Sequence, residues 1–210
     1  MNYCDPSGHD WEWGSLWRGL GYLATGIGAV VAGALVFASG VATLPMLIVA
    51  GVTIGAGALT AINGVSELVA AGTGYNFVED GLFGGNSAAY NTYATVMGSI
   101  ATVGSMACGI WYGYNIPKMQ VNKLLDTYSV KFKHLPDAAG KWSKFASSDQ
   151  AYLRSLAKCA LRNTPMRRWT VNDATSYKII YDFGCAIGTR GETAVRLVFA
   201  LDAIITFFPQ

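Results

Sequence analysis

Long stretches without charge dominate the first half of the chain. No charged residue occurs from Gly19 to Ser66, and a second uncharged run extends from Gly81 to Pro117. A helix needs roughly 20 apolar residues to cross a bilayer, so the first run is long enough to cross twice and the second once. The pattern therefore predicts three apolar helices, with breaks near Pro45 and between residues 73 and 86. We expect these helices at residues 21–40, 44–65 and 89–114.

Small residues recur at helical spacing within these runs, as at Gly28 and Ala32 and at Gly51 and Gly55. In lipid this spacing lets helix backbones approach closely, and we expect these pairs to lie at helix contacts. Three interpretations remain open: a segment that inserts conditionally, a stable membrane anchor and a soluble all-α core. Aromatic residues at the ends of the runs suit a membrane–water interface. They are Trp11, Trp13, Trp17, Tyr22, Trp111, Tyr112 and Tyr114.

After Pro117 the pattern becomes that of an ordinary soluble domain. Residues 147–163 predict an amphipathic helix, with Ser147 as its N-cap and Gln150 as the capping-box partner. Three runs with a period of two follow and predict an antiparallel meander, at residues 177–183, 193–201 and 203–209. The chain is therefore predicted to be α+β, with an all-α apolar region before a small domain of helices packed on a sheet. The apolar face of the predicted helix holds Tyr152, Leu153, Leu156, Ala160 and Leu161.

Charge divides the chain at the same place as hydropathy. Residues 1–117 hold one basic and six acidic residues, a net of about −5, whereas residues 118–210 hold fourteen basic and seven acidic residues, about +7. A domain with this excess of positive charge is expected to bind RNA through its phosphates. The small overall charge of +2 therefore hides two different halves.

The cysteines and the first residues exclude some classes of protein. Cys4, Cys108, Cys159 and Cys185 form no CxxC pair and do not cluster with histidine, so neither a zinc site nor a disulfide framework is predicted. A β-turn is predicted at residues 5–8 with no strand before it, and we therefore expect the natural chain to be longer. The first residues also lack the basic and apolar regions of a secretory signal.

The stretch NYCDPSGH, at residues 2–9, resembles the end of the core module of Rhs, or YD-repeat, proteins. These are polymorphic toxins in which a β-cage encloses a variable C-terminal toxin. Residues 73–104 look like the glycine-rich apolar region that follows this junction in many such toxins. Residues 133–209, from KHLPDAAGKWSKF to TFFP, are similar to toxin nucleases related to barnase, the colicin tRNases and RelE.

This resemblance implies a division of the chain and a set of partners. Residues 1–16 would be the end of the Rhs core and a linker, residues 17–117 a translocation region and residues 118–210 the toxin domain. The protein would be secreted, cross the membrane of a competitor and act in its cytoplasm. Its partners would be RNA, with tRNA as one candidate, a cognate immunity protein, the Rhs cage and the target-cell membrane. No cofactor is implied.

RNA cleavage without a metal requires a base for the 2′-hydroxyl, an acid for the 5′-oxygen and cations around the phosphate. His134 is the one histidine after residue 117, and it stands in a lysine-rich segment. Because histidine titrates near neutrality, His134 is predicted to transfer the proton, with a pKa lowered by the nearby cations. The alternative is a partly buried structural histidine in a loop. As a catalytic loop residue, His134 is expected to contribute little to packing.

Other basic and hydroxyl residues complete the predicted site. Arg190 and Thr189 lie in a glycine-bounded loop that is expected to reach a phosphate, and Arg167, Arg168 and Trp169 pair cations with a stacking aromatic. If Arg196 and Thr206 share a face with His134, that face is expected to be the active surface. The predicted catalytic residues are His134, Lys141, Arg190 and Thr206. The predicted RNA-binding residues are Lys133, Lys144, Thr189, Arg196, Arg167 and Arg168.

Several alternatives can be weighed on residue types alone. Residues 118–210 contain no zinc-deaminase signature and no P-loop, and a single histidine is too few for an HNH-type metal nuclease. No metal site is predicted. A cysteine hydrolase that pairs Cys159 or Cys185 with His134 lacks any surrounding signature and is a minor alternative. The second function class is a membrane-disrupting toxin acting through residues 19–117, with the basic domain only a binding module.

Overall fold

A computed structural model describes residues 11–210, which form two compact units. The first unit contains the described residues up to Ala38 together with Leu44–Tyr112, and the second contains Ser39–Thr43 and Gly113–Gln210. The predicted turn at residues 5–8 lies outside the described residues, as does most of the predicted segment 1–16.

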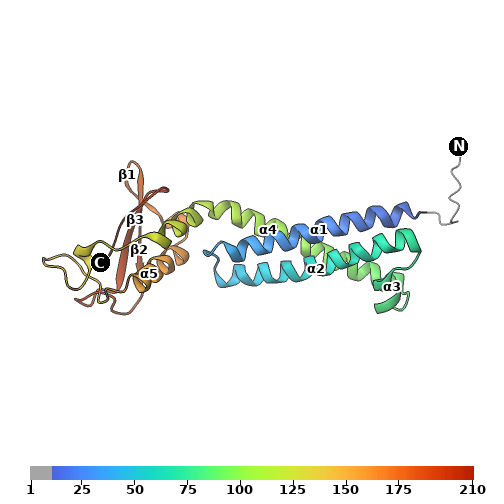
Figure 1. Cartoon of the computed structure of the whole chain (residues 1–210), viewed down its shortest axis with the longest axis horizontal. Helices are drawn as coiled ribbons and strands as arrows, with labels where there is room; N and C mark the ends of the chain where they lie inside the picture. The colour runs from blue at the N-terminus through green and yellow to red at the C-terminus, as the bar shows by residue number, and fades with distance from the viewer. Residues whose placement is uncertain (1–10) are drawn as a thin grey trace. The chain divides into compact units, whose positions relative to one another are not determined.

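Helices alone build the described part of the first unit (Figure 1). The predicted breaks near Pro45 and between residues 73 and 86 are confirmed, because α2 begins at Leu44 and only a short helix lies in the second interval. α1, α2 and α4 are each long and apolar enough to cross a membrane. The bounds are α1, Trp13–Ala38; α2, Leu44–Thr73; α3, Phe77–Leu82; and α4, Ser87–Thr127, which continues into the second unit.

α1 and α2 run side by side and touch through glycines (Figure 1). A Cβ added at Gly26 of α1 would lie 2.5 Å from the backbone nitrogen of Ala61, and one at Gly64 of α2 would lie 2.5 Å from that of Leu23. No real Cβ fits at such distances, so the two backbones are in direct contact. This close approach is the arrangement that small residues permit between helices in lipid.

The glycines that make this contact on α1 are spaced seven residues apart, at Gly19, Gly26 and Gly33, and all three are buried. Seven residues are close to two helical turns, so the three lie on one face. The pairs predicted from four-residue spacing were the wrong ones. An added Cβ would meet nothing within 4 Å in the described chain at Gly28, Gly51 and Gly55.

A buried carboxylate connects all four helices of the first unit. Glu67 of α2 is 2% exposed, and its Oε2 lies 3.3 Å from the guanidinium of Arg18 on α1. Tyr90 of α4 donates its hydroxyl to Glu67 Oε1 at 2.9 Å, and Asn76, the N-cap of α3, donates its amide at 3.4 Å. One turn earlier on α2, Asn63 is fully buried, and neither atom of its amide has a hydrogen-bond partner within residues 11–210.

The second unit contains the end of α4, α5, two one-turn 3₁₀ helices and a sheet. Its strands are antiparallel and follow chain order, β1-β2-β3-β4, which confirms the predicted meander and the α+β class. β1 was not predicted. The bounds are η1, Phe132–His134; α5, Gln150–Asn163; η2, Met166–Arg168; β1, Thr170–Asp173; β2, Ser176–Asp182; β3, Ala194–Phe199; and β4, Ile204–Pro209.

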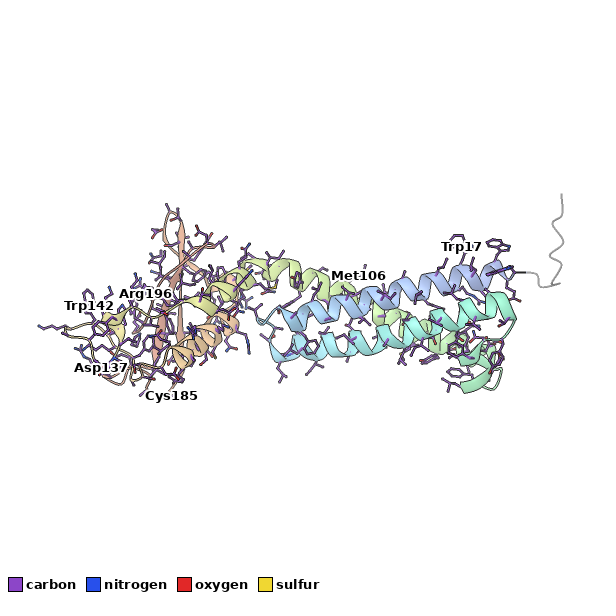
Figure 2. All side chains as sticks on the ribbon, viewed as in Figure 1. Trp17, Met106, Asp137, Trp142, Cys185 and Arg196 are labelled. Atoms are coloured by element: carbon purple, nitrogen blue, oxygen red, sulfur yellow. The ribbon has the colours of Figure 1, made fainter. Side chains whose placement is uncertain are left out.

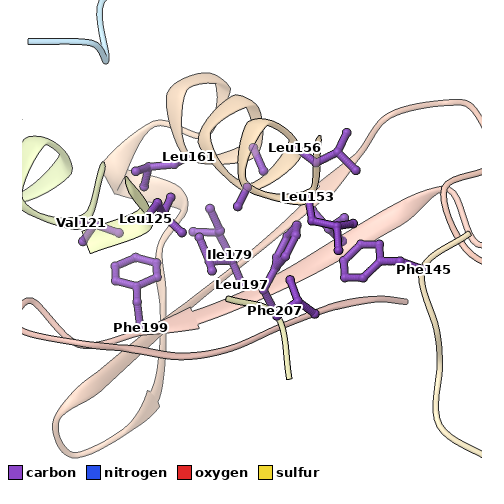
Figure 3. Packing of buried hydrophobic residues seen from close by; sticks show 14 of the residues in the cluster. Val121, Leu125, Phe145, Leu153, Leu156, Leu161, Ile179, Leu197, Phe199 and Phe207 are labelled. Carbon is purple, nitrogen blue, oxygen red and sulfur yellow. The ribbon is translucent and has the colours of Figure 1, made fainter. Parts of the chain in front are cut away.

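One face of the sheet packs against α5 and the end of α4 (Figure 3). Ile179, Leu197 and Phe207 stand opposite one another on β2, β3 and β4, and all three are almost completely buried. Leu153 of α5 and Leu125 of α4 belong to the same cluster. Because strand residues alternate between faces, Arg196 points to the other side of the sheet, as its position in the predicted strand requires.

The start of α5 differs from the prediction. Asp149 is the N-cap, and its carboxylate accepts a backbone N–H of the first turn at 2.8 Å, whereas Ser147 accepts the N–H of Asp149 at 3.1 Å. The side chain of Gln150 accepts the N–H of Val130 at 2.8 Å, so no capping box forms. Tyr152, predicted on the apolar face, is 44% exposed.

α4 continues through Pro117 to Thr127, whereas the third apolar helix was expected to end at residue 114. Proline removes one helical hydrogen bond and crowds the carbonyl of the residue four positions earlier, here Gly113. The two units divide between Tyr112 and Gly113, about one turn before Pro117. The proline therefore marks the transition between the units without ending the helix.

Candidate functional site

The ring of His134, at the end of η1, is held in two ways. Its Nδ1 lies 3.0 Å from the carbonyl oxygen of Ser143, and because a carbonyl only accepts, Nδ1 carries the hydrogen. The ring also stacks on Phe208, with 5.0 Å between ring centroids and 14° between ring planes. Nε2 makes no hydrogen bond within residues 11–210, so its lone pair is free to accept a proton.

His134 is buried, with 4% of its surface exposed, and is not the weakly packed loop residue that was expected. Burial lowers the pKa of His134 below its usual value, and the charges of Lys133 and Lys131 lower it further, while the Ser143 carbonyl opposes them. The lysines therefore lower the pKa of His134 as predicted, but burial lowers it more. The imidazole is neutral at pH 7, which is the form that a general base requires.

The segment that carries His134 wraps around the edge strand β4. Successive strand residues face opposite sides, so Phe207 faces the core and Phe208 faces the outer side of the sheet. Phe145 packs on Phe207 with 4.9 Å between centroids, whereas His134 stacks on Phe208. The N–H of Phe145 donates to the carbonyl of His134 at 2.9 Å. A residue anchored in the core thus holds the histidine on the outer face.

Arg196 lies on the same outer face, opposite Phe208 in the β3–β4 register. Its guanidinium carbon is 5.9 Å from the centre of the Phe208 ring, and it donates to the side-chain oxygen of Asn172 at 3.4 Å. The Nε of Arg196 is buried and has no hydrogen-bond partner among the described residues. Thr206 lies two residues before Phe208 on β4 and therefore shares this face. The outer face thus presents an imidazole, a guanidinium and a hydroxyl.

Trp142 exposes a large aromatic surface next to His134, and it stands on the same unit as Arg196 (Figure 2). Its ring meets the imidazole edge-on at 6.5 Å, the Nζ of Lys133 lies 4.5 Å from its centre, and 54% of the residue is exposed. An exposed aromatic beside cations is suited to stacking a nucleobase. Neither Trp142 nor Phe208 was predicted. Trp142 could have been predicted from the lysine-rich segment that surrounds it. Phe208 could not, because in the sequence it looks like any other apolar strand residue.

The loop between β2 and β3 is joined to the segment before α5. The backbone N–H of Thr189 donates to the carbonyl of Lys144 at 2.9 Å, and the Nζ of Lys144 donates to the carbonyl of Ala138. The backbone N–H of Arg190 donates to Glu192 Oε2 at 2.9 Å. The main chain at Thr189 is therefore bound to the segment that also carries His134.

Lys141 and Arg190, both predicted to be catalytic, are exposed. Within residues 11–210, no hydrogen bond, ion pair or ring contact joins either side chain to His134. The contacts therefore join His134 and Arg196 to Phe208 and Lys133 to Trp142. Thr206 shares their face of the sheet by its position on β4, and Lys141 and Arg190 lie outside this set of contacts.

The predicted cluster at Arg167, Arg168 and Trp169 is divided. The two arginines are exposed on η2, but the Trp169 ring packs edge-on against Phe199 at 4.8 Å and lies 5.9 Å from Tyr177. The contacts do not favour Trp169 as a platform for nucleic acid, because its partly buried ring packs against the core. The arginines remain exposed cations.

Metal-binding and cysteine chemistry find little support in the described chain. Among residues 11–210, no group of three or more His, Cys, Asp or Glu side chains is placed to hold a metal ion. Cys159 accepts a hydrogen bond from the side-chain amide of Asn163 at 3.3 Å, and Cys185 is exposed in the β2–β3 loop. Neither cysteine contacts His134 in the part of the chain that the structure describes.

No protein-family model, curated protein or solved structure matches the chain. The chemistry of the outer face therefore has to follow from its own geometry. That geometry combines a neutral histidine of defined tautomer, a guanidinium near the same Phe208 ring and an exposed indole on a basic domain.

Proposed function

We propose that the second unit is a metal-independent endoribonuclease in which His134 is the general base. The observation that carries the proposal is the hydrogen bond from Nδ1 to Ser143, because it leaves the Nε2 lone pair unused in a ring that stacks on Phe208, the residue that Arg196 also contacts. A burial-lowered pKa keeps this nitrogen unprotonated at neutral pH. A positioned base typically contributes 10²- to 10⁴-fold to the rate of such a reaction.

In the proposed reaction Nε2 takes the proton of the 2′-hydroxyl. The 2′-oxygen forms a bond to phosphorus, the bond from phosphorus to the 5′-oxygen breaks, and the 5′-oxygen leaves with a proton from solvent. The imidazolium keeps its Nδ1–H on the Ser143 carbonyl, which stabilises the positive charge. Arg196 and the hydroxyl of Thr206 would bind the charged phosphate, with Lys141 and Arg190 drawn to it from their exposed positions.

RNA binding would extend beyond the reacting phosphate. Trp142 is placed to stack a base next to His134, with Lys133 on its ring. Exposed Arg167 and Arg168, together with the segment at Lys144 and Thr189, would contact further phosphates. The net charge of about +7 in residues 118–210 supports such contacts.

The apolar first unit is proposed to deliver this domain across the membrane of a target cell. Three helices of sufficient length and hydropathy support this part of the proposal. The resemblance of residues 2–9 to the end of an Rhs core, which lies outside the described residues, would add a cage before the chain. A toxin of this kind would also require an immunity protein in its producer and would act in the target cytoplasm after secretion.

The proposal is tested with the full chain in detergent, incubated with tRNA and total RNA in excess EDTA. His134→Asn is the decisive variant, because the asparagine amide can still donate to Ser143 while Nε2 is lost. We expect cleavage to fall by 10²-fold or more with RNA binding retained. His9→Asn, the same substitution at the other histidine, should cleave normally. Intact RNA with the unmodified chain, or full activity of His134→Asn, would refute the assignment.

A membrane lesion is the second candidate function. It is favoured by the large apolar side chains on the outside of the first unit, such as Val31, Val52 and Ile110, which are 52%, 56% and 76% exposed. Release of a trapped dye from lipid vesicles by the His134→Asn chain, at the concentration that kills cells, would support a lesion. Killing that requires His134 and occurs without dye release would support the nuclease.

A further inference from the structure

The apolar side chains of the first unit cover its outside on all three long helices. Val31 of α1, Val52 of α2 and Ile110 of α4 are more than half exposed, while glycines and hydroxyl residues fill the contacts between helices. A soluble monomer rarely exposes apolar patches of more than a few hundred Å². Lipid chains are the occupant that suits a surface without charge on every side.

The helices are long enough to cross a lipid bilayer. α1 has 26 residues and α2 has 30, which at 1.5 Å per residue give about 39 and 45 Å, more than the roughly 30 Å of a hydrocarbon core. Trp11, just before α1, and Trp13 and Trp17, in its first turns, are all more than half exposed, and Tyr114 of α4 is 58% exposed. Exposed tryptophan and tyrosine at both ends of a span are typical of the two membrane interfaces.

Three crossings would place acidic residues and basic residues of the chain on opposite sides of the membrane. Three crossings put the start of α1, the end of α2 and the α3 connector on one side, and residues 39–43 and the residues after α4 on the other. The first side carries Glu12, Glu79 and Asp80, whereas Arg18 is paired with the buried Glu67. The second side begins with four lysines against one acidic residue, Asp126. The lysines are Lys118, which is buried, and Lys123, Lys131 and Lys133.

Basic residues close to the end of a span are retained on the cytoplasmic side of a membrane. We infer that the first unit crosses a bilayer three times, with the α3 connector outside the cell and residues 118–210 on the cytoplasmic side. This inference rests on the proposed membrane insertion and is independent of the proposed nuclease chemistry. It assigns the occupant of the apolar surface and the side on which the basic domain emerges.

Cysteine labelling of spheroplasts tests the inference in the full chain. Every variant carries His134→Asn, which is introduced to prevent toxicity, and has alanine in place of Cys4, Cys108 and Cys159. Native Cys185 reports on the basic domain, and Leu82→Cys, at a 76% exposed position of α3 in a Cys185→Ala chain, reports on the connector. A membrane-impermeant maleimide should label Leu82→Cys about tenfold more than Cys185 in intact spheroplasts. After lysis the two should label equally.

A third reporter separates the possible failures. Val31→Cys, in the middle of α1 and 52% exposed, should stay unlabelled until detergent is added. Labelling of Val31→Cys without detergent would show that the helices do not insert, which overturns the inference. Equal labelling of the other two reporters before lysis would overturn the odd number of crossings, and preferential labelling of Cys185 would overturn the orientation. None of these outcomes depends on RNA cleavage, which is measured separately.

Discussion

In the first unit the residues in closest contact are glycines, whereas in the second unit they are leucine, isoleucine and phenylalanine side chains. Gly26 and Gly64 bring the backbones of α1 and α2 together, and most of the larger apolar residues of these helices are exposed. Leu197 and Phe207 fill the interior of the second unit, and its charged side chains other than Lys118 lie at least partly exposed. The two units therefore have opposite distributions of apolar volume.

The difference fits the surroundings proposed for each unit, which are lipid for the first and water for the second. A sheet in water gains stability by burying apolar side chains, because their removal from water is favourable. Helices in lipid gain nothing from that transfer and depend on close packing and on interhelical hydrogen bonds. The contacts from Tyr90 and Asn76 to Glu67 are such hydrogen bonds. Substitutions matched in chemistry should therefore have different effects in the two units.

The largest effect is expected at the glycine contact. Gly26→Leu places a side chain where a Cβ would already lie 2.5 Å from the Ala61 backbone, so α1 and α2 must separate. We expect a loss of more than about 3 kcal/mol in the stability of the first unit, the upper end of overpacking effects. The measurement is an unfolding titration of the full chain in mixed micelles, followed by circular dichroism.

Gly28→Leu is the matched control, because a Cβ there would meet nothing within 4 Å in the described chain. Replacing an exposed helical glycine should leave stability unchanged or raise it by up to about 1 kcal/mol. Equal losses in Gly26→Leu and Gly28→Leu would contradict the direct contact of backbones.

In the second unit a comparable loss of stability is expected when a buried side chain is made smaller. Leu197→Ala empties a fully buried position between Ile179 and Phe207, and a loss of about 3 kcal/mol is expected. Ile180→Ala, at a 51% exposed position on the other face of β2, should cost less than about 1 kcal/mol. Hydrogen exchange of the β2–β4 amides in the full chain measures both. Similar losses at the two positions would mean that the sheet buries both faces equally.

A smaller effect is expected at the buried carboxylate. Tyr90→Phe removes the hydroxyl that donates to Glu67 and should weaken the first unit by about 2 kcal/mol, because a buried acceptor loses a partner. Tyr93→Phe is the control, three residues further along α4 and without a hydrogen bond to this group in the described chain. The same micelle titration should separate the two variants. If they behave alike, the carboxylate contributes nothing through Tyr90.

The smallest expected effect is the change in stability of the second unit with pH. Because the pKa of His134 is lowered on folding, mainly by burial, the unfolded chain binds more protons than the folded chain just below pH 6.5. Stability is therefore complete above the ordinary histidine pKa and falls as the pH drops toward the folded value, by at most about 1.4 kcal/mol per pH unit. Proton NMR should give a lower pKa for His134 in the folded chain than in the chain unfolded by urea. A His134 pKa that does not rise on unfolding would contradict the burial.

Hydrophobic patterning predicted most of the fold. Uncharged runs indicated the three long helices, and alternation indicated β2, β3 and β4. The contact face of α1 was missed, because the four-residue spacing at Gly28 is also present on a face that meets no neighbour. The cap of α5 was missed because Ser147 and Asp149 are both good caps, and only the tertiary bond of Gln150 to Val130 excludes the capping box.

Only part of the candidate site could be predicted from the sequence. His134 stood out because it is a single histidine among lysines, and Arg196 because it interrupts an apolar strand. Their common partner, Phe208, gave no signal, since it meets His134 only after the chain wraps around β4. Trp169 shows the converse, because a tryptophan next to two arginines suggested a surface role while its ring packs in the core.

The chain-order arrangement of the sheet has a kinetic consequence. Each strand pairs with its neighbour in sequence, so every pairing closes a short loop and the contact order of the sheet is low. Hairpins of this kind form in about 1–10 µs, and no pairing has to wait for a distant segment. A domain of this topology that crosses a membrane unfolded would rebuild its sheet one hairpin at a time as the chain emerges.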